Sequence, residues 1–166
     1  MTSHLAPIGD RERAAFYRAA LLLGLVRGEA VVAWADDVLA ERPDPPAPFV
    51  DLASTVPGDL TALRERLLEL SGEGASEAVV AGVIDLVRRD LASGRRSFAD
   101  TMTVLKQLRA FTRLDASLNE EVKSLGVAVG LAPPGSQARA DAERRVREWL
   151  HACDGRADRF LAPAAS

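Results

Sequence analysis

The sequence predicts an all-α fold, a single compact domain of about seven amphipathic helices arranged as an irregular helical bundle. Apolar residues recur at the three- and four-residue spacing of a helix face through most of the 166 residues. Residue types that cap helix N-termini precede these segments, and no convincing run alternates apolar and polar residues as strands do. The apolar fraction of 48% is that of a globular chain with one sizeable core.

In the first third of the chain, the pattern predicts two helices followed by a stiff loop. Residues 1–9 are expected to form a flexible leader, and the helical domain is expected to cover residues 10–155. Asp10 is expected to be the N-cap of the first helix, and the wide apolar face of this helix indicates a central, largely buried position. The second helix ends at Arg42, because a proline disfavours helical geometry in the residue before it. The Pro-rich stretch 43–48 then predicts a stiff crossover loop on the surface of the domain.

After a short helical piece over 49–54, five further helices are expected. Each of them begins at a residue able to cap it: Asp59, Ser76, Ser97, Ser117 and Ser136. Ser97 with Asp100 and Ser117 with Glu120 have the spacing of a capping box. The segment 125–131 alternates large and small residues as a strand does, but the capping box before it favours a helix. Residues 156–166 are expected to form a C-terminal tail.

The most informative feature for function is the separation of charge along the chain. Seven acids and one base lie between Glu29 and Asp59, whereas seven bases and two acids lie between Arg88 and Arg113. The opposite charges of the two segments largely cancel, so the net charge of the chain is only −3. Separated charge bears on how a protein meets a partner rather than on its fold or chemistry.

The acidic segment provides the leading binding hypothesis. Neighbouring acids on one helix repel each other by a few tenths of a kcal/mol per pair, and a basic partner would compensate for this cost. The acids expected to steer such a partner are Asp36, Asp37, Glu41 and Asp44. Trp34 or Phe49 would anchor the partner if either side chain is exposed. Two other interpretations stay open, a simple solvated face and internal neutralisation of the acids by arginines. The arginines considered for that internal role are Arg95, Arg96, Arg109 and Arg113.

A basic cluster follows in the second half of the chain, around the end of the helix that starts at Ser76. It consists of Arg88, Arg89, Arg95 and Arg96. Bases at this end of a helix complement its dipole and bind its open carbonyl groups. A nucleic-acid-binding domain would be basic overall, with aromatic residues among the bases. The sequence pI of about 5.5 argues against that class, and we expect no nucleic-acid partner.

No residue pattern predicts catalysis, a metal site or a cofactor. His151 and Cys153 are two residues apart on one helix, so they point to different faces, and we expect Cys153 in the core and His151 on the surface. Two histidines and one cysteine do not supply the usual zinc ligand sets. The glycine spacings lack the Lys-Ser/Thr pair of a phosphate-binding loop. An enzyme is therefore the less favoured class.

These observations predict a non-catalytic protein-binding module, of the immunity- or antitoxin-like inhibitor or adaptor type. It would bind a protein with a basic surface through the acidic helix and loop. The alternative is a small-molecule sensor or an enzyme with a pocket between helices. The residues considered for such a pocket are Tyr17, Arg18, Trp34 and Arg109. A third possibility is a homo-oligomer, a dimer in contact through Gly126 and Gly130.

Composition also bears on where the protein works. All but two of the 21 basic residues are Arg and alanine is abundant, which we interpret as the usage of a GC-rich bacterial genome. The longest apolar run, 19–26, is far shorter than the roughly 20 residues that cross a membrane. The single cysteine permits no internal disulfide. We expect a bacterial, cytoplasmic protein without a membrane partner.

Overall fold

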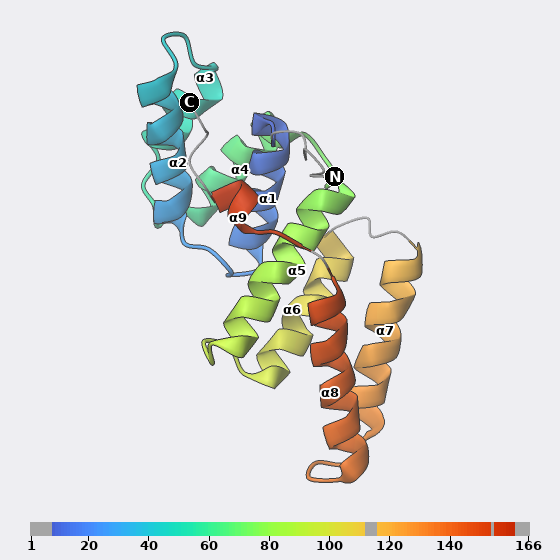
Figure 1. Ribbon diagram of the computed structural model, residues 1–166. Helices are drawn as coiled ribbons and strands as arrows, with labels where there is room; N and C mark the ends of the chain where they lie inside the picture. Colours follow the sequence, from blue (N-terminus) through green and yellow to red (C-terminus); the bar gives the residue numbers. More distant parts are fainter. Residues whose placement is uncertain (1–7, 112–115, 154, 162–166) are drawn as a thin grey trace.

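The computed structural model describes residues 8–111, 116–153 and 155–161, and these residues form nine helices and no strand (Figure 1). The all-α prediction is therefore confirmed. The helices are α1 (Asp10–Leu22), α2 (Gly28–Glu41), α3 (Ala47–Ala53), α4 (Leu60–Ser71), α5 (Glu77–Ala92), α6 (Phe98–Phe111), α7 (Ala116–Leu131), α8 (Gln137–Ala152) and α9 (Asp158–Leu161).

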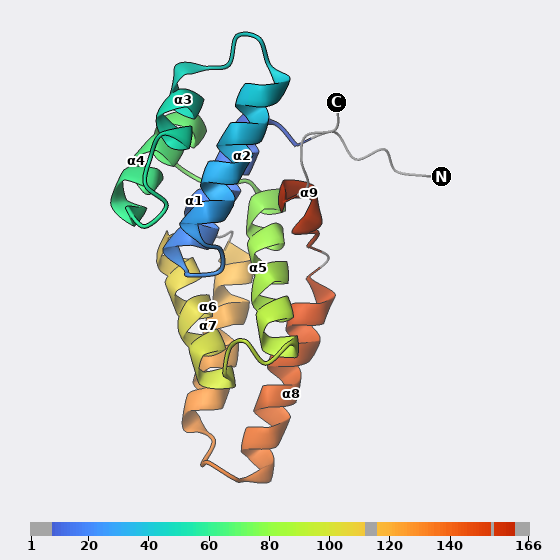
Figure 2. The ribbon, with the colours of Figure 1, turned by 90° about the vertical axis from the view of Figure 1, so that its left-hand side faces the viewer.

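The helices pack in two adjoining groups. In the first, α1 lies against α4, and α3 lies against both α2 and α4. In the second, α7 and α8 form an antiparallel pair that packs on α5 and α6 and extends past their ends (Figure 2). Helix α1 joins the groups because it also packs against α5. Its fully buried Ala14, Phe16 and Ala20 confirm the central position that its wide apolar face predicts.

Most of the predicted caps occupy the expected positions. The side chains of Asp59, Ser76 and Ser136 accept hydrogen bonds from backbone N–H groups three residues later, at 3.0–3.3 Å. The prediction that Asp10 caps the first helix is wrong, because Gly9 occupies the N-cap and Asp10 is the first helical residue. The prediction that Ser117 is an N-cap is also wrong, since Ser117 is the second residue of α7.

The segment 125–131 is helical, as the last two turns of α7, so the strand interpretation is wrong. The Pro-rich crossover is shorter than predicted, because α3 begins at Ala47 with Pro48 in its first turn. Proline suits that position, where its missing N–H would have no helical partner. The connection between α2 and α3 therefore spans only residues 42–46.

The C-terminal segment is part of the core, although the sequence predicts a tail from residue 156. Phe160 is 2% exposed, and its ring stacks on that of Phe16 at 4.5 Å between centroids. The backbone of α5 approaches Phe160 closely at Gly82, where an added Cβ would lie 2.7 Å from the ring. The tail boundary at 155/156 therefore divides a folded region, whereas residues 162–166 lie outside the described ranges. Most of the predicted leader, residues 1–7, also lies outside them.

Candidate functional site

The four acids predicted to steer a partner lie together at one end of α2. Asp36, Asp37 and Glu41 are exposed on the C-terminal half of the helix, and Asp44 is exposed in the loop that follows. The opposite face of α2 is held in the core by Val31, Trp34, Ala35 and Val38, which fixes the acids outward. We call these four acids the acidic surface. None of them forms a hydrogen bond or ion pair with any residue that the structure describes.

The local field does not favour this concentration of negative charge. The C-terminal end of a helix carries the negative end of its dipole, which disfavours acids there. The nearest base along the chain, Arg42, is engaged elsewhere, because it forms a two-pronged ion pair with Asp10 at 2.5 and 2.8 Å. This hydrogen bonding raises the pKa of Arg42 above its ordinary value. The acidic surface therefore keeps its charge exposed to solvent.

Trp34 and Phe49 are buried, so the exposure that an anchoring role requires is absent. Trp34 is 4% exposed, and its ring stacks on Tyr17 with centroids 5.2 Å apart. Phe49 is fully buried and meets Trp34 edge to face at 5.1 Å. These aromatic rings fasten α2 and α3 to α1 and are not available to a partner. The large apolar side chain that α3 does expose is Val50, at 49%.

The first two arginines of the basic cluster are used by the fold. Both Arg88 and Arg89 donate to Asp85, at 2.6 and 2.8 Å, and Arg89 also holds Asp158 through two hydrogen bonds. Asp85 is 2% exposed and accepts a further hydrogen bond, at 3.0 Å, from the backbone N–H of Ala157. This network fastens the segment containing α9 to α5.

The carboxylate at the centre of this network stays charged. Burial alone would raise the pKa of Asp85, but the hydrogen bonds from Ala157, Arg88 and Arg89 outweigh burial and lower it. The pKa of Asp158 is lowered as well, chiefly by its hydrogen bonds from Arg89. In both residues the lowered pKa results from hydrogen bonds within the network, so the charged form of each carboxylate is the one that the fold binds.

The other two arginines of the cluster face Asp90, not the acidic surface. Arg95 and Arg96 each lie 3.8 Å from the Asp90 carboxylate, and Arg96 also donates to the Gly24 carbonyl at 3.1 Å. Arg109 is bound to the side chain of Asn119 at 2.7 Å. The interpretation that these three arginines neutralise the acidic surface is therefore wrong. Arg113, the fourth arginine considered, lies outside the described residues.

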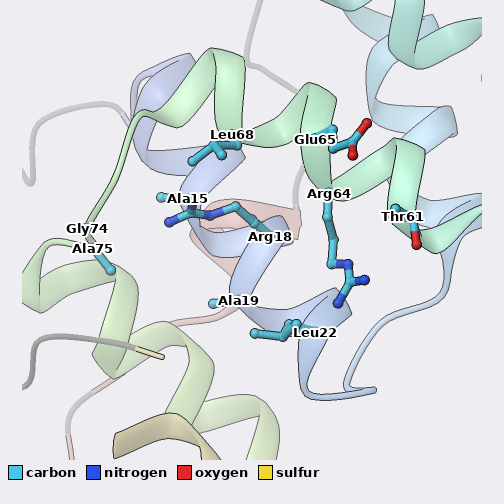
Figure 3. Close-up of a pocket in the computed structure, with 10 residues that line it drawn as sticks. All are labelled: Ala15, Arg18, Ala19, Leu22, Thr61, Arg64, Glu65, Leu68, Gly74 and Ala75. Atoms are coloured by element: carbon cyan, nitrogen blue, oxygen red, sulfur yellow. The ribbon is translucent and has the colours of Figure 1, made fainter. Parts of the chain in front are cut away.

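A groove lies between α1 and α4, and we call it the α1/α4 groove (Figure 3). Its volume is about 390 Å³, within the range typical of small-molecule sites. The lining residues are Ala15, Arg18, Ala19, Leu22, Thr61, Arg64, Glu65, Leu68, Gly74 and Ala75. Of the four residues predicted for a pocket, only Arg18 lines this one. Tyr17 and Trp34 are in the core, and Arg109 lies on α6.

The remaining candidates have structural or solvent-facing positions. Cys153 is half-buried against the core, and burial raises its thiol pKa to about 11, whereas His151 is exposed. A Cβ added at Gly126 would lie 3.9 Å from the Lys106 side chain of α6, and one at Gly130 would meet no described atom within 4 Å. A homodimer contact through these glycines stays a prediction. Within the described ranges, no three acidic, His or Cys side chains are grouped to hold a metal ion. In the same residues, no helix is long and apolar enough to cross a membrane.

No protein-family model matches the chain, and comparisons with curated proteins and with solved structures found no significant match.

Proposed function

We propose that the protein is a non-catalytic, cytoplasmic bacterial protein-binding module that uses its acidic surface to bind a protein with a basic surface. An immunity- or antitoxin-like inhibitor and an adaptor are the two types that fit this proposal. The observation that carries it is that all four acids, Asp36, Asp37, Glu41 and Asp44, are exposed and form no ion pair or hydrogen bond with the described residues.

Several of the basic residues that the structure describes differ from these four acids in this respect. Arg42, Arg88, Arg89 and Arg96 all form hydrogen bonds or ion pairs elsewhere in the fold, and none of them forms one with the acidic surface in the described structure. Exposed charge of one sign attracts a partner of the opposite sign over several ångströms and raises the rate of association. It also discriminates against partners of the same sign.

A protein interface also needs apolar contact area. Trp34 and Phe49 do not supply it, because both are in the core. Val50 is half exposed on α3, which packs against α2, so it is a large apolar side chain that a partner could cover. Replacing Val50 with Ser therefore tests whether α3 supplies apolar contact area to the partner.

The experiment is affinity capture from a bacterial lysate, with three tagged forms of the full chain compared by mass spectrometry. The second form carries asparagine or glutamine in place of the acidic surface: D36N, D37N, E41Q and D44N. The third, a control of equal charge change, alters exposed acids on other faces: E73Q, E77Q, E120Q and E148Q.

We expect the wild type and the control to capture the same basic protein in stoichiometric amount, and the acidic-surface variant to lose it. Capture that is equal for all three forms would remove the acidic surface from the proposal. Capture of nothing by the wild type would count against a protein-binding role.

A small-molecule sensor is the second candidate function, and the observation that favours it is the α1/α4 groove. This groove is independent of the acidic surface, because its walls come from α1, α4 and the connection before α5.

A further inference from the structure

The inner wall of the α1/α4 groove is apolar and recessed. Two alanines one helical turn apart, Ala15 and Ala19, take up little volume on the α1 side, so the wall is low there. Leu22 continues the same face, and Leu68 forms the opposite wall on α4. Leu68 is 39% exposed, which leaves a large apolar side chain facing solvent at the groove. Covering such a surface is favourable, because it removes apolar area from water.

Two cationic side chains border this apolar surface. Arg18 is half-buried and forms no hydrogen bond or ion pair with any described residue. Arg64 donates its Nε–H to the Leu60 carbonyl at 3.2 Å and forms no ion pair in the described part of the chain. In Figure 3, Arg64 extends from α4 toward Leu22, and Arg18 extends along α1 toward Ala15.

One carboxylate also belongs to the lining. Glu65 stands at the outer rim, and Figure 3 shows its carboxylate pointing away from the guanidinium groups of Arg18 and Arg64. It is exposed, and it pairs with neither arginine in the described structure. In the described structure, Arg18 therefore keeps all its N–H donors free for an anionic ligand, and Arg64 keeps those of its two terminal nitrogens free.

We propose that the α1/α4 groove binds a small amphipathic carboxylate, with an aliphatic body on the alanine and leucine wall and its carboxylate at Arg18. A guanidinium group presents paired N–H donors that match the two oxygens of a carboxylate. The apolar wall contributes through burial of the body, and neither part is used by the acidic surface.

The size of the groove suits a small ligand. Its volume of about 390 Å³ lies within the range typical of small-molecule sites. A short aliphatic carboxylate fits the available volume.

The test is titration of the full-length protein with octanoate, followed through backbone amide shifts by NMR and through heat by calorimetry. Two analogues with the same chain, 1-octanol and octylamine, replace the carboxylate with a neutral and a cationic group. We expect octanoate to shift amides of α1 and α4, and we expect 1-octanol to bind about tenfold more weakly. Octylamine is expected to bind more weakly still.

Three variants locate the site. R18Q is expected to weaken octanoate binding about tenfold or more and to leave 1-octanol binding unchanged. A19F is expected to abolish binding of both, because its ring fills the groove. R156Q changes an exposed arginine that does not line the groove and is expected to bind octanoate as the wild type does.

Circular dichroism of each variant separates loss of binding from loss of fold. If A19F unfolds, R18Q alone still decides the matter, since its side chain is half-exposed and has no internal partner. The absence of octanoate-induced shifts in α1 and α4 would overturn the proposal. Equal binding of octanoate by R18Q and the wild type, or of octylamine and octanoate, would overturn it too. The acidic-surface variant should retain octanoate binding, so this proposal and the proposed function can fail separately.

Discussion

Helices α2 and α5 both carry dense charge, but they use it in opposite ways. On α5, Asp85 is buried and receives hydrogen bonds from two arginines and a backbone N–H group. On α2, the acids of the acidic surface are exposed and have no partner among the described residues. The charges of α5 hold the fold together through hydrogen bonds and ion pairs, whereas the acidic surface forms neither with the described residues.

This difference teaches that charge density along a sequence does not identify a binding surface by itself. The basic cluster and the acidic segment are equally conspicuous in the sequence. Only the three-dimensional partners separate them, and Arg89 shows why, because Asp158 lies 69 residues away in the chain. A surface is a binding candidate when its charges remain unpaired after folding.

The largest expected effect concerns the attachment of α9, which the network on α5 supports. Phe160→Ala removes a buried ring that stacks on Phe16, and we expect it to lower the free energy of unfolding by about 3–5 kcal/mol. Urea denaturation measures this change. The control Leu161→Ala, at a side chain 36% exposed, should cost less than about 1 kcal/mol. Equal effects of the two substitutions would mean that α9 is not anchored by its buried ring.

The next effect tests the network itself. Asp85→Asn keeps the shape of the side chain but removes the charge that Arg88 and Arg89 bind, and we expect a loss of about 2–3 kcal/mol. Its matched control is Asp36→Asn on α2, which should change the free energy of unfolding by less than about 0.5 kcal/mol. A loss of similar size in both variants would erase the contrast between the two helices.

The same network predicts a dependence of stability on pH. The pKa of Asp85 is lower in the folded protein than its ordinary value of about 3.9, so the folded state binds this proton less readily than the unfolded chain. The resulting stabilisation is fully present above the ordinary value and is lost as the pH falls through the folded value. Urea denaturation between pH 6 and about 3 should show a steeper loss for the wild type than for Asp85→Asn. Parallel curves would contradict the role assigned to Asp85.

The smallest expected effect belongs to the acidic surface. Replacing its four acids with asparagine or glutamine removes mutual repulsion and an unfavourable interaction with the α2 dipole. We therefore expect the free energy of unfolding to rise by about 0.3–1 kcal/mol, which urea denaturation can resolve. A fall of similar or larger size would reveal an internal partner for these acids.

The sequence predicted the helices well because helix periodicity and capping are local properties. It missed α9, since four residues are too few to display a period and Phe160 gains its burial from Phe16 and Gly82, distant in the chain. The burial of Trp34 could have been predicted from the sequence, because Trp34 lies on the same helix face as Val31 and Val38. Phe49 lies on a helix of only seven residues, where the pattern does not settle which face is buried.

The candidate sites were predictable only in part. The acids of the acidic surface are close in sequence, so their clustering was predictable, but their lack of hydrogen-bond and ion-pair partners among the described residues was not. Asp85 did leave a signal, as a lone acid within the apolar run of α5, although its contact with Ala157 spans 72 residues. The α1/α4 groove has no local signal, since Ala19 and Leu68 come from helices separated by α2 and α3.

The most direct test of the contrast between α2 and α5 measures how fast the protein binds its captured partner. The association rate constant is determined by stopped flow over a range of salt concentrations. Steering by the acidic surface predicts a wild-type rate that falls steeply with added salt, and a slower, nearly salt-independent rate for the acidic-surface variant. The charge-matched control variant should follow the wild type. Identical rates and identical salt dependence for the wild type and the acidic-surface variant would contradict the role proposed for these four acids.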